Sequence, residues 1–380
     1  MELLSKEIIQ ELMAIDQNPC LSLYMPTHRS HPEKLQDPIR FKNLLKQLEK
    51  SLLQKYSAGE VKKHIEPMET LVDDNSLWSH TSNGLAVFSA AGLFKIVGLP
   101  VSVDELAMVA DSFHTKPLRQ YLQSTDRYHV LGVSLQGIRL FEGDRHSLVE
   151  VELHAEAQKS NTDATVDELK DSGSIAGSAG EYLSLHNDTG SEQDEEKKDA
   201  EQFFRVVANL IYERYSKPTG WPLILAALPE HHNLFRKVNK NPMLLDKSIA
   251  INPTSLSTDK LVNLAWEIME PEYLLKLDSF VSRFEQARAN GKGSDDIKEV
   301  AAAAVEGRVD TLLIEADRMI AVRITNLITG NTQKKDLSNP KVDDLLDDMA
   351  DLVTKMGGQV MVLPTEKIPS ETGLAAIFRY

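Results

Sequence analysis

The 380-residue sequence contains one cysteine, Cys20, which excludes an internal disulfide framework and fits a reducing compartment. No apolar run approaches the ~18 residues of a membrane-spanning helix, and the start MELLSKEIIQELMAI lacks the order of a signal peptide. Basic residues are also few: 42 Lys and Arg against 57 Asp and Glu give a net charge of -15. This balance argues against bulk, non-specific nucleic-acid binding but allows local basic patches. We therefore expect a cytoplasmic protein of two or three domains with no membrane segment.

Residues 1–124 have the helix and strand patterns of an α/β domain. Amphipathic spacing predicts a helix over 1–15 and a second one near 59–73, and the apolar stretch 20–26 predicts a strand. The sequence GLAVFSAAGLFKIVGLP predicts a β-hairpin that turns at Ala91-Gly92.

A basic surface is expected on the helix that begins at Asp37-Pro38, interpreted as an N-cap and the first helical residue. Its apolar face consists of Phe41, Leu44, Leu45, Leu48 and Leu52. Lysines recur at i, i+4 and i+8 on the other face, which is either a solvated surface or one that contacts phosphates. The candidate RNA-binding residues of this region are His28, Arg29, His31, Lys42, Lys46 and Lys50.

Residues 125–272 form the expected middle domain. The sequence YHVLGVSLQGIRLFEGDRHSLVEVEL alternates apolar and polar residues, which predicts three antiparallel strands. The following insert, 156–199, is rich in Gly, Ser, Asp and Glu and has too few large apolar residues to form a core. We expect a long flexible loop whose functional residues are Gly173, Ile175, Gly177, Gly180, Tyr182 and Leu185.

After the loop, the sequence predicts a helix over 199–215 and a buried strand over 221–229. The next segment, EHHNLFRKVNKNP, contains His231 and His232. An adjacent His pair can suggest a metal site, but no third ligand stands at a suitable spacing, so we interpret the segment as a surface turn and predict no metal. Three basic residues of this segment are further candidates for RNA binding: Arg236, Lys237 and Lys240.

Residues 273–380 are expected to form a third domain. A helix from Thr258 to about Ala289 is predicted to break at Pro271, which would be the joint to this domain. Ser294 or Asp295 would cap the next helix. Strands VDTLLIEA, MIAVRIT, QVMVLP and AAIFRY alternate with the helix DDLLDDMADLVTKM, which predicts a three-layer α/β/α sandwich.

The chain resembles the archaeal and eukaryotic class-1 release factors and Pelota, and especially the bacterial branch of that superfamily. The opening LSLYMPTH with the basic helix and GLAVF is similar to the family's first domain, and ILAALPEHHNLFRKV resembles the bacterial middle domain. DDIKEVAAAAVEGRVDTLLI and the terminal GLAAIFRY are similar to the ribosomal-protein-like third domain. The resemblance implies three α/β domains in release-factor order across essentially the whole chain.

The resemblance also implies partners. The protein would enter the ribosomal A site and contact rRNA, with its middle loop directed toward the peptidyl-transferase centre. A translational GTPase would bind through the third domain, and no cofactor is implied.

The release-factor motif Gly-Gly-Gln is absent from the expected loop. In true release factors its glutamine helps water attack the peptidyl-tRNA ester, whereas Ser172–Gly180 here has glycines but no glutamine. The stop-codon-reading tetrapeptide has no match around 38–46 either. Gly357-Gly358-Gln359 does spell the motif, but it follows a predicted helix and precedes a strand, so we interpret it as a helix stop.

These observations favour a non-enzymatic factor in ribosome rescue, quality control or hibernation, without codon-directed peptide release. The alternative is an enzyme that acts on peptidyl-tRNA or RNA, as an esterase or endonuclease. A third possibility is a stress-linked scaffold that does not meet the ribosome, which the acidity of the chain keeps open.

Overall fold

The computed structural model describes residues 1–15, 17–29, 32–123, 126–134, 137–153, 192–251, 257–322 and 343–380. The chain folds into two compact units. We call Met1–Ser124 together with Leu274–Tyr380 the split unit, and Thr125–Tyr273 the inserted unit. The split unit thus has an N-terminal half and a C-terminal half that are far apart in the sequence.

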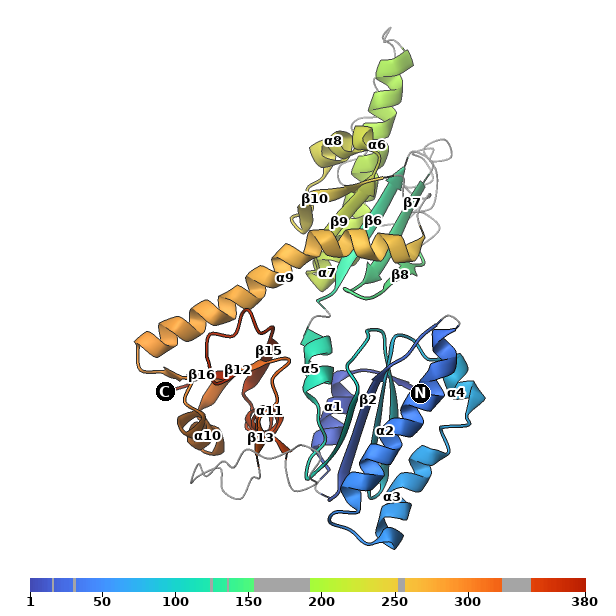
Figure 1. Ribbon diagram of the computed structural model, residues 1–380. Helices are drawn as coiled ribbons and strands as arrows, with labels where there is room; N and C mark the ends of the chain where they lie inside the picture. The colour runs from blue at the N-terminus through green and yellow to red at the C-terminus, as the bar shows by residue number, and fades with distance from the viewer. Residues whose placement is uncertain are drawn as a thin grey trace. The chain divides into compact units, whose positions relative to one another are not determined.

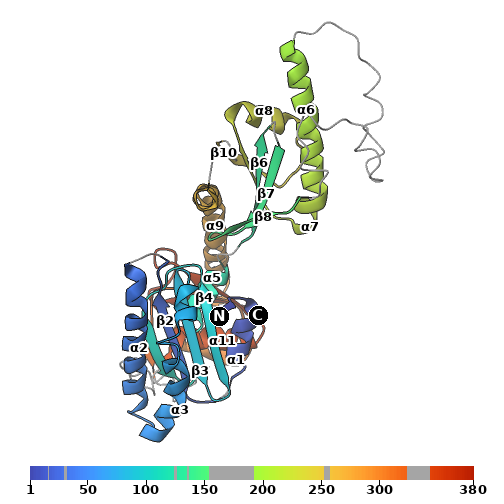
Figure 2. The ribbon, with the colours of Figure 1, turned by 90° about the vertical axis from the view of Figure 1, so that its right-hand side faces the viewer.

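The N-terminal half of the split unit is a five-stranded sheet between two layers of helices. The strand order is β1-β4-β3-β2-β5, antiparallel except for the edge pair β1–β4. Helices α2, α3 and α4 cover one face and α1 and α5 the other, as Figure 2 shows for α2 and α1. The strands are β1 (Glu2–Leu3), β2 (Cys20–Pro26), β3 (Gly84–Ala90), β4 (Leu93–Leu99) and β5 (Leu106–Ala110). The helices are α1 (Lys6–Met13), η1 (Glu33–Gln36), α2 (Asp37–Leu52), α3 (Ala58–Glu69), α4 (Asn75–Ser79) and α5 (Lys116–Gln123).

The C-terminal half contains a four-stranded sheet with the order β11-β16-β12-β15. Helices α10 and α11 share one apolar cluster on one face of this sheet. The second half of α9 passes over the other side (Figure 1), where Leu277, Phe280 and Phe284 are buried. The elements are β11 (Gly293–Ser294), α10 (Ile297–Val305), β12 (Val309–Glu315), β13 (Ala321–Val322), β14 (Asp343–Asp344), α11 (Leu345–Lys355), β15 (Gln359–Leu363) and β16 (Leu374–Phe378).

The inserted unit is built on the sheet β10-β9-β6-β7-β8. Helices α6 and α8 pack on one face, and the first half of α9 packs on the other. The strands are β6 (Tyr128–Ser134), β7 (Gly137–Gly143), β8 (Leu148–Val151), β9 (Leu223–Ala227) and β10 (Leu244–Ala250). The helices are α6 (Glu192–Ile211), η2 (Tyr212–Ser216), α7 (Lys217–Thr219), α8 (Pro229–Val238) and α9 (Thr258–Ala289).

The predicted α/β class is confirmed, and so is the three-layer arrangement of the C-terminal half. The three antiparallel strands β6, β7 and β8 and the hairpin with Gly92 in the left-handed region (φ 81°) also match the sequence patterns. Within the described residues, no helix is both long and apolar enough to cross a membrane.

Several expected boundaries were wrong. The helix predicted over 1–15 is shorter, because Glu2–Leu3 pairs with β4 as an edge strand. Helix α6 begins at Glu192, inside the stretch expected to be loop, since glutamate and lysine that suit a solvated loop are also good helix formers.

Helix α9 does not break at Pro271, contrary to the prediction. It runs as one helix of 32 residues, from Thr258 to Ala289. Pro271 is exposed, so water can satisfy the carbonyl group that loses its hydrogen bond to the missing N–H.

The predicted cap of α10 was wrong by one residue. Asp296 is the N-cap, and its Oδ1 accepts hydrogen bonds from the N–H groups of Lys298 and Glu299 at 2.9 and 3.0 Å. Ser294 lies in β11, and Asp295 forms an ion pair with Arg288 instead.

Candidate nucleic-acid interface

Helix α2 presents a charged face and an apolar face, as its sequence predicts. The five expected apolar residues are all buried in the core beneath the helix. Lys42, Lys46 and Lys50 are exposed, and none of them forms an ion pair within the described part of the chain. Successive lysines lie about 6 Å apart along the helix axis, so their charges form a continuous stripe.

At the start of α2, Asp37 organises a cluster of polar side chains. It is fully buried, and its Oδ1 lies 2.9 Å from Nδ1 of His28 and 3.0 Å from Nη1 of Arg40. Its Oδ2 accepts the backbone N–H of His28 at 2.8 Å, and Arg40 also donates to Glu105 at 2.7 Å. The predicted N-cap role of Asp37 was therefore wrong: the carboxylate ties the loop after β2 to the helix, and η1 leads directly into α2.

This cluster fixes the orientation of the His28 imidazole. Nδ1 of His28 faces Oδ1 of Asp37, so Nε2 takes no part in this contact. The His28 side chain is 34% exposed, which leaves it accessible from solvent. An imidazole ring oriented by a carboxylate is a common arrangement in general acid–base catalysis.

Two further candidate RNA-binding residues, Arg29 and His31, lie near His28 in the sequence. Arg29 is exposed in the loop after β2, beside His28 in the sequence. His31 lies outside the described residues. The structure therefore places five of the six predicted residues of this region on the loop and helix that follow β2.

Two of the three basic residues predicted for RNA binding in the inserted unit form contacts within that unit. Nη2 of Arg236 donates to the carbonyl oxygens of Leu245 and Asp246 at 2.9 and 2.7 Å, which ties α8 to β10. Lys237 pairs with Glu201 at 2.7 Å, and Lys240 is exposed beyond the end of α8. An RNA-binding role for these three residues stays a prediction.

The surface-turn interpretation of His231 and His232 was wrong, because both lie in helix α8. His231 is buried against Phe204, with ring centroids 5.5 Å apart. The ring of His232 lies 2.8 Å from the carbonyl oxygen of Ala227 and 2.9 Å from Oγ of Ser248. The helical spacing of Phe235 and Val238 from His231 was the signal for α8. In the residues that the structure describes, no group of acidic, His or Cys side chains could hold a metal ion.

The predicted functional loop lies outside the described residues. Its candidate residues, Gly173, Ile175, Gly177, Gly180, Tyr182 and Leu185, therefore stay predictions.

The Gly357-Gly358-Gln359 triplet is a helix stop, as predicted. Gly357 is in the left-handed region (φ 76°), and the N–H of Gly358 bonds to the carbonyl of Val353 at 2.8 Å. Gln359 then starts β15, where it pairs with Thr311. The glutamine is exposed at the end of this strand.

A hollow in the inserted unit was not anticipated from the sequence. It has a volume of about 440 Å³ and two tryptophans among its lining residues, Trp221 and Trp266. Arg127 lies over the Trp221 ring and Arg145 over the Trp266 ring, at 5.3 and 4.7 Å from the ring centroids. The chain has only three tryptophans, so their clustering was the available signal.

Part of the chain is similar to a known protein family. Residues 127–308, just under half of the chain, match the family described as bacterial archaeo-eukaryotic release factor family 3. This part of the chain is therefore similar to the bacterial branch of the release-factor superfamily. The release-factor match spans nearly all of the inserted unit and continues through α10.

The chain is also similar to several solved structures of archaeal and yeast proteins. The archaeal termination factor aRF1 is 17% identical, with 98% of this chain and 96% of that chain covered and a TM-score of 0.26. Dom34 of S. cerevisiae is 12% identical over 76% and 73% of the two chains, with a TM-score of 0.33. A chain from a model of ribosome-bound archaeal Pelota and ABCE1 is 12% identical over 100% and 95%, with a TM-score of 0.39. A comparison with curated proteins finds no match.

Proposed function

We propose that this chain is a ribosome-associated translation factor that acts in ribosome rescue, quality control or hibernation without codon-directed peptide release. The observation that carries the proposal is the release-factor family match over residues 127–308, combined with a middle stretch that has no Gly-Gly-Gln. The match supports a translation role, and the missing glutamine argues against ester hydrolysis by the release-factor mechanism.

The partners in this proposal are the ribosomal A site and, through residues 273–380, a translational GTPase. The exposed lysine stripe of α2 supports contact with rRNA, because three exposed ammonium groups on one face suit a phosphate backbone. A net charge of -15 over the whole chain means that such binding depends on this local surface.

Ribosome pelleting at two salt concentrations tests the proposal. The protein should pellet with ribosomes at low salt and less at high salt, because phosphate contacts release counterions on binding. Absence from the pellet at low salt would contradict a ribosomal role and favour the scaffold alternative.

The His28–Asp37 pair favours a second candidate function, RNA cleavage. A histidine oriented by a buried carboxylate could act as the general base at a ribose 2′-hydroxyl, and it lies next to the lysine-bearing helix. Incubation of the protein with ribosomes, followed by analysis of rRNA ends, tests this function. Cleavage that disappears in His28→Gln would support it, and intact rRNA with the wild-type protein would exclude it.

A further inference from the structure

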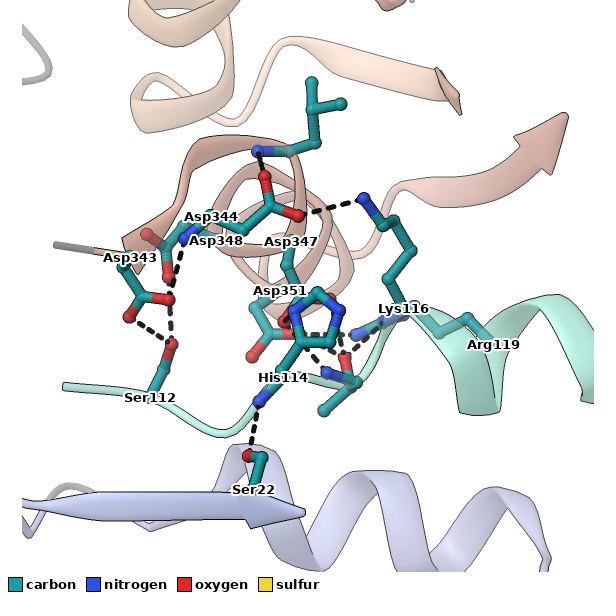
Figure 3. Close-up of polar contacts among 12 residues, drawn as sticks. Ser22, Ser112, His114, Lys116, Arg119, Asp343, Asp344, Asp347, Asp348 and Asp351 are labelled. Carbon is teal, nitrogen blue, oxygen red and sulfur yellow. Dashed lines mark hydrogen bonds and ion pairs between the residues drawn. The ribbon is translucent and has the colours of Figure 1, made fainter. Parts of the chain in front are cut away.

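A buried acidic contact joins the two halves of the split unit (Figure 3). The C-terminal half contributes β14 and the start of α11, and the N-terminal half contributes the loop before α5 and α5 itself. The acidic residues are Asp343, Asp344, Asp347, Asp348 and Asp351. Four of these residues are at most 7% exposed, and only Asp348 is partly exposed.

Two of the five carboxylates are neutralised by cations. Nζ of Lys116 lies 2.9 Å from Oδ2 of Asp344, and Nη2 of Arg119 lies 2.7 Å from Oδ1 of Asp351. Both cations come from α5 and are themselves largely buried. Across the described residues, no lysine or arginine forms an ion pair with the other three aspartates.

The aspartates without a paired cation contact hydroxyl groups. These hydroxyl groups have fewer hydrogen atoms than the ionised carboxylates around them could accept. Oγ of Ser112 lies 3.2 Å from Oδ2 of Asp343 and 2.9 Å from Oδ1 of Asp348. A hydroxyl has one hydrogen, so it can donate to only one of these oxygens. The second contact is a hydrogen bond only if one of the two carboxyl groups is protonated and donates to Ser112.

Thr115 repeats this arrangement one turn further along α11. Its Oγ1 lies 3.3 Å from Oδ1 of Asp347 and 3.1 Å from Oδ1 of Asp351, and it already accepts from Nε of Arg119 at 3.0 Å. Its single hydrogen again faces two carboxyl oxygens. Each hydroxyl-bridged pair of aspartates therefore forms both of its hydrogen bonds when it holds one shared proton.

Burial favours the protonated form of three of these aspartates, because it raises their pKa values. It raises the pKa of Asp343 to about 7, with the charge of Asp347 adding to the effect. Burial likewise holds the pKa of Asp347 and of Asp348 well above the ordinary range, aided by the neighbouring aspartates.

Among the residues that the structure describes, the other titratable groups that face the contact supply no positive charge. Nδ1 of His114 lies 3.5 Å from Oδ2 of Asp347, but neither ring nitrogen forms a hydrogen bond within the described residues. Burial lowers the pKa of His114 to about 4, so the ring is neutral above that pH. From β2, burial raises the pKa of the Cys20 thiol to about 12 and that of the Tyr24 phenol further, which keeps both neutral. Asp111, which acts on Cys20, adds only negative charge.

We propose that this contact is a proton-linked latch, which holds the halves of the split unit together while each hydroxyl-bridged aspartate pair shares a proton and releases them when those protons leave. The latch includes Ser112, Thr115, Lys116 and Arg119 on one side and the five aspartates on the other.

The direction of the pH dependence follows from the protons. The aspartates have a higher pKa when docked, so docking is favoured below their ordinary pKa of about 4 and is lost as pH rises through about 7. His114 acts in the opposite sense, because its pKa falls on docking, but only between about 6.5 and 4. Above about 6.5 the aspartates act alone, and docking should weaken about tenfold per pH unit for each proton held.

Energy transfer between dyes on the two halves of the full-length chain tests the latch. Gln47→Cys on α2 and Met356→Cys after α11 are exposed labelling positions, whereas the native Cys20 is fully buried. Between pH 5.5 and 9, transfer in the labelled protein should change reversibly as the latch opens, while far-UV circular dichroism stays constant.

Amide substitutions distinguish the latch from a general effect of pH. In Asp343→Asn/Asp347→Asn the amide N–H groups replace the shared protons, so opening should move to higher pH or disappear. Lys116→Met removes the cation paired with Asp344 and should open the latch at lower pH. Asp317→Asn, at an exposed position of the same half, should leave the transition unchanged.

Three outcomes would overturn the proposal. Energy transfer could be independent of pH in the wild-type sequence. The double amide variant could follow the wild-type transition. Circular dichroism could change together with energy transfer, in which case the transition is unfolding and not the opening of a contact.

Discussion

At the residue scale, the glycines before β15 have a backbone role that the adjacent glutamine does not share. A Cβ on Gly358 would lie 2.6 Å from Cγ1 of Val353 and 2.8 Å from the carbonyl oxygen of Val309. Gln359 is exposed at the start of the strand. The triplet therefore contains one position that tolerates a new side chain, Gln359, and two that do not, Gly357 and Gly358.

We expect Gly358→Ala to lower the free energy of unfolding by ~1–3 kcal/mol, because the backbone oxygen of Val309 cannot easily move away. Gln359→Ala should leave both stability and every ribosomal assay unchanged. Denaturant unfolding and ribosome pelleting of the two variants measure this. A selective loss of ribosomal activity in Gln359→Ala, with normal unfolding, would show that the triplet is a functional motif.

Single residues also show why the site was only partly predictable. The exposure of the α2 lysines follows from helical spacing alone, so it could be predicted. The role of Asp37 could not, because Asp before Pro is a common cap pattern and nothing local indicates burial. Glu105 joins that cluster from 65 residues away through Arg40, and such distant partners leave no local signal.

At the element scale, the N-cap of α10 gives a local test of the structure. Asp296→Ala should cost about 1 kcal/mol, because two N–H groups of the first turn lose their acceptor. Asp295→Ala is the matched control and should have a smaller effect, since the ion pair with Arg288 is partly exposed. Thermal unfolding measures the stability of both variants. A larger loss of stability in Asp295→Ala would show that Asp295 is the N-cap, as the sequence predicted.

The lysine stripe of α2 is the element that should contact rRNA. Replacing Lys42, Lys46 and Lys50 with Glu should weaken ribosome pelleting at low salt and reduce its salt dependence, because three phosphate contacts become repulsive. Folding should be unaffected, since all three side chains are exposed. Asn43→Ala/Gln47→Ala, also exposed on α2, is the uncharged control. Pelleting that survives the charge reversal would identify the stripe as an ordinary solvated surface.

Helix α9 illustrates where element boundaries could not be derived from the sequence. Proline usually interrupts a helix, and the break at Pro271 was predicted for that reason. The helix continues because apolar residues on both sides of the proline are buried, Ala265 and Met269 before it and Leu277 after it. Packing over the whole length of α9 outweighs one missing hydrogen bond.

At the scale of the whole molecule, the proposed function predicts the absence of peptide release. With ribosomes loaded with formyl-methionyl-tRNA, the full-length protein should release no more formyl-methionine than buffer does, because the 172–180 stretch contains no glutamine. A bona fide release factor provides the positive control. Stoichiometric release by this protein would reverse the conclusion and make the enzyme alternative the better one.

The order of predicted helices and strands along the chain indicated the α/β class. It did not indicate that Met1–Ser124 and Leu274–Tyr380 fold into one unit. The aspartates of β14 and α11 resemble a solvated helix face in the sequence, because five acidic residues lie within nine positions, 343–351. In the structure they are buried against α5. Only the three-dimensional partner distinguishes the two cases, and that partner is more than two hundred residues away.

The sequence separation between Lys116 and Asp344 has a consequence for synthesis of the chain. These two buried partners are 228 residues apart, with the whole inserted unit between them. At a translation rate of about 5–20 residues per second, Lys116 emerges roughly 10–50 s before Asp344. During that interval the surface of α5 that later receives α11 is open on the nascent protein. A chaperone that recognises basic, partly apolar segments would therefore have its longest opportunity at α5.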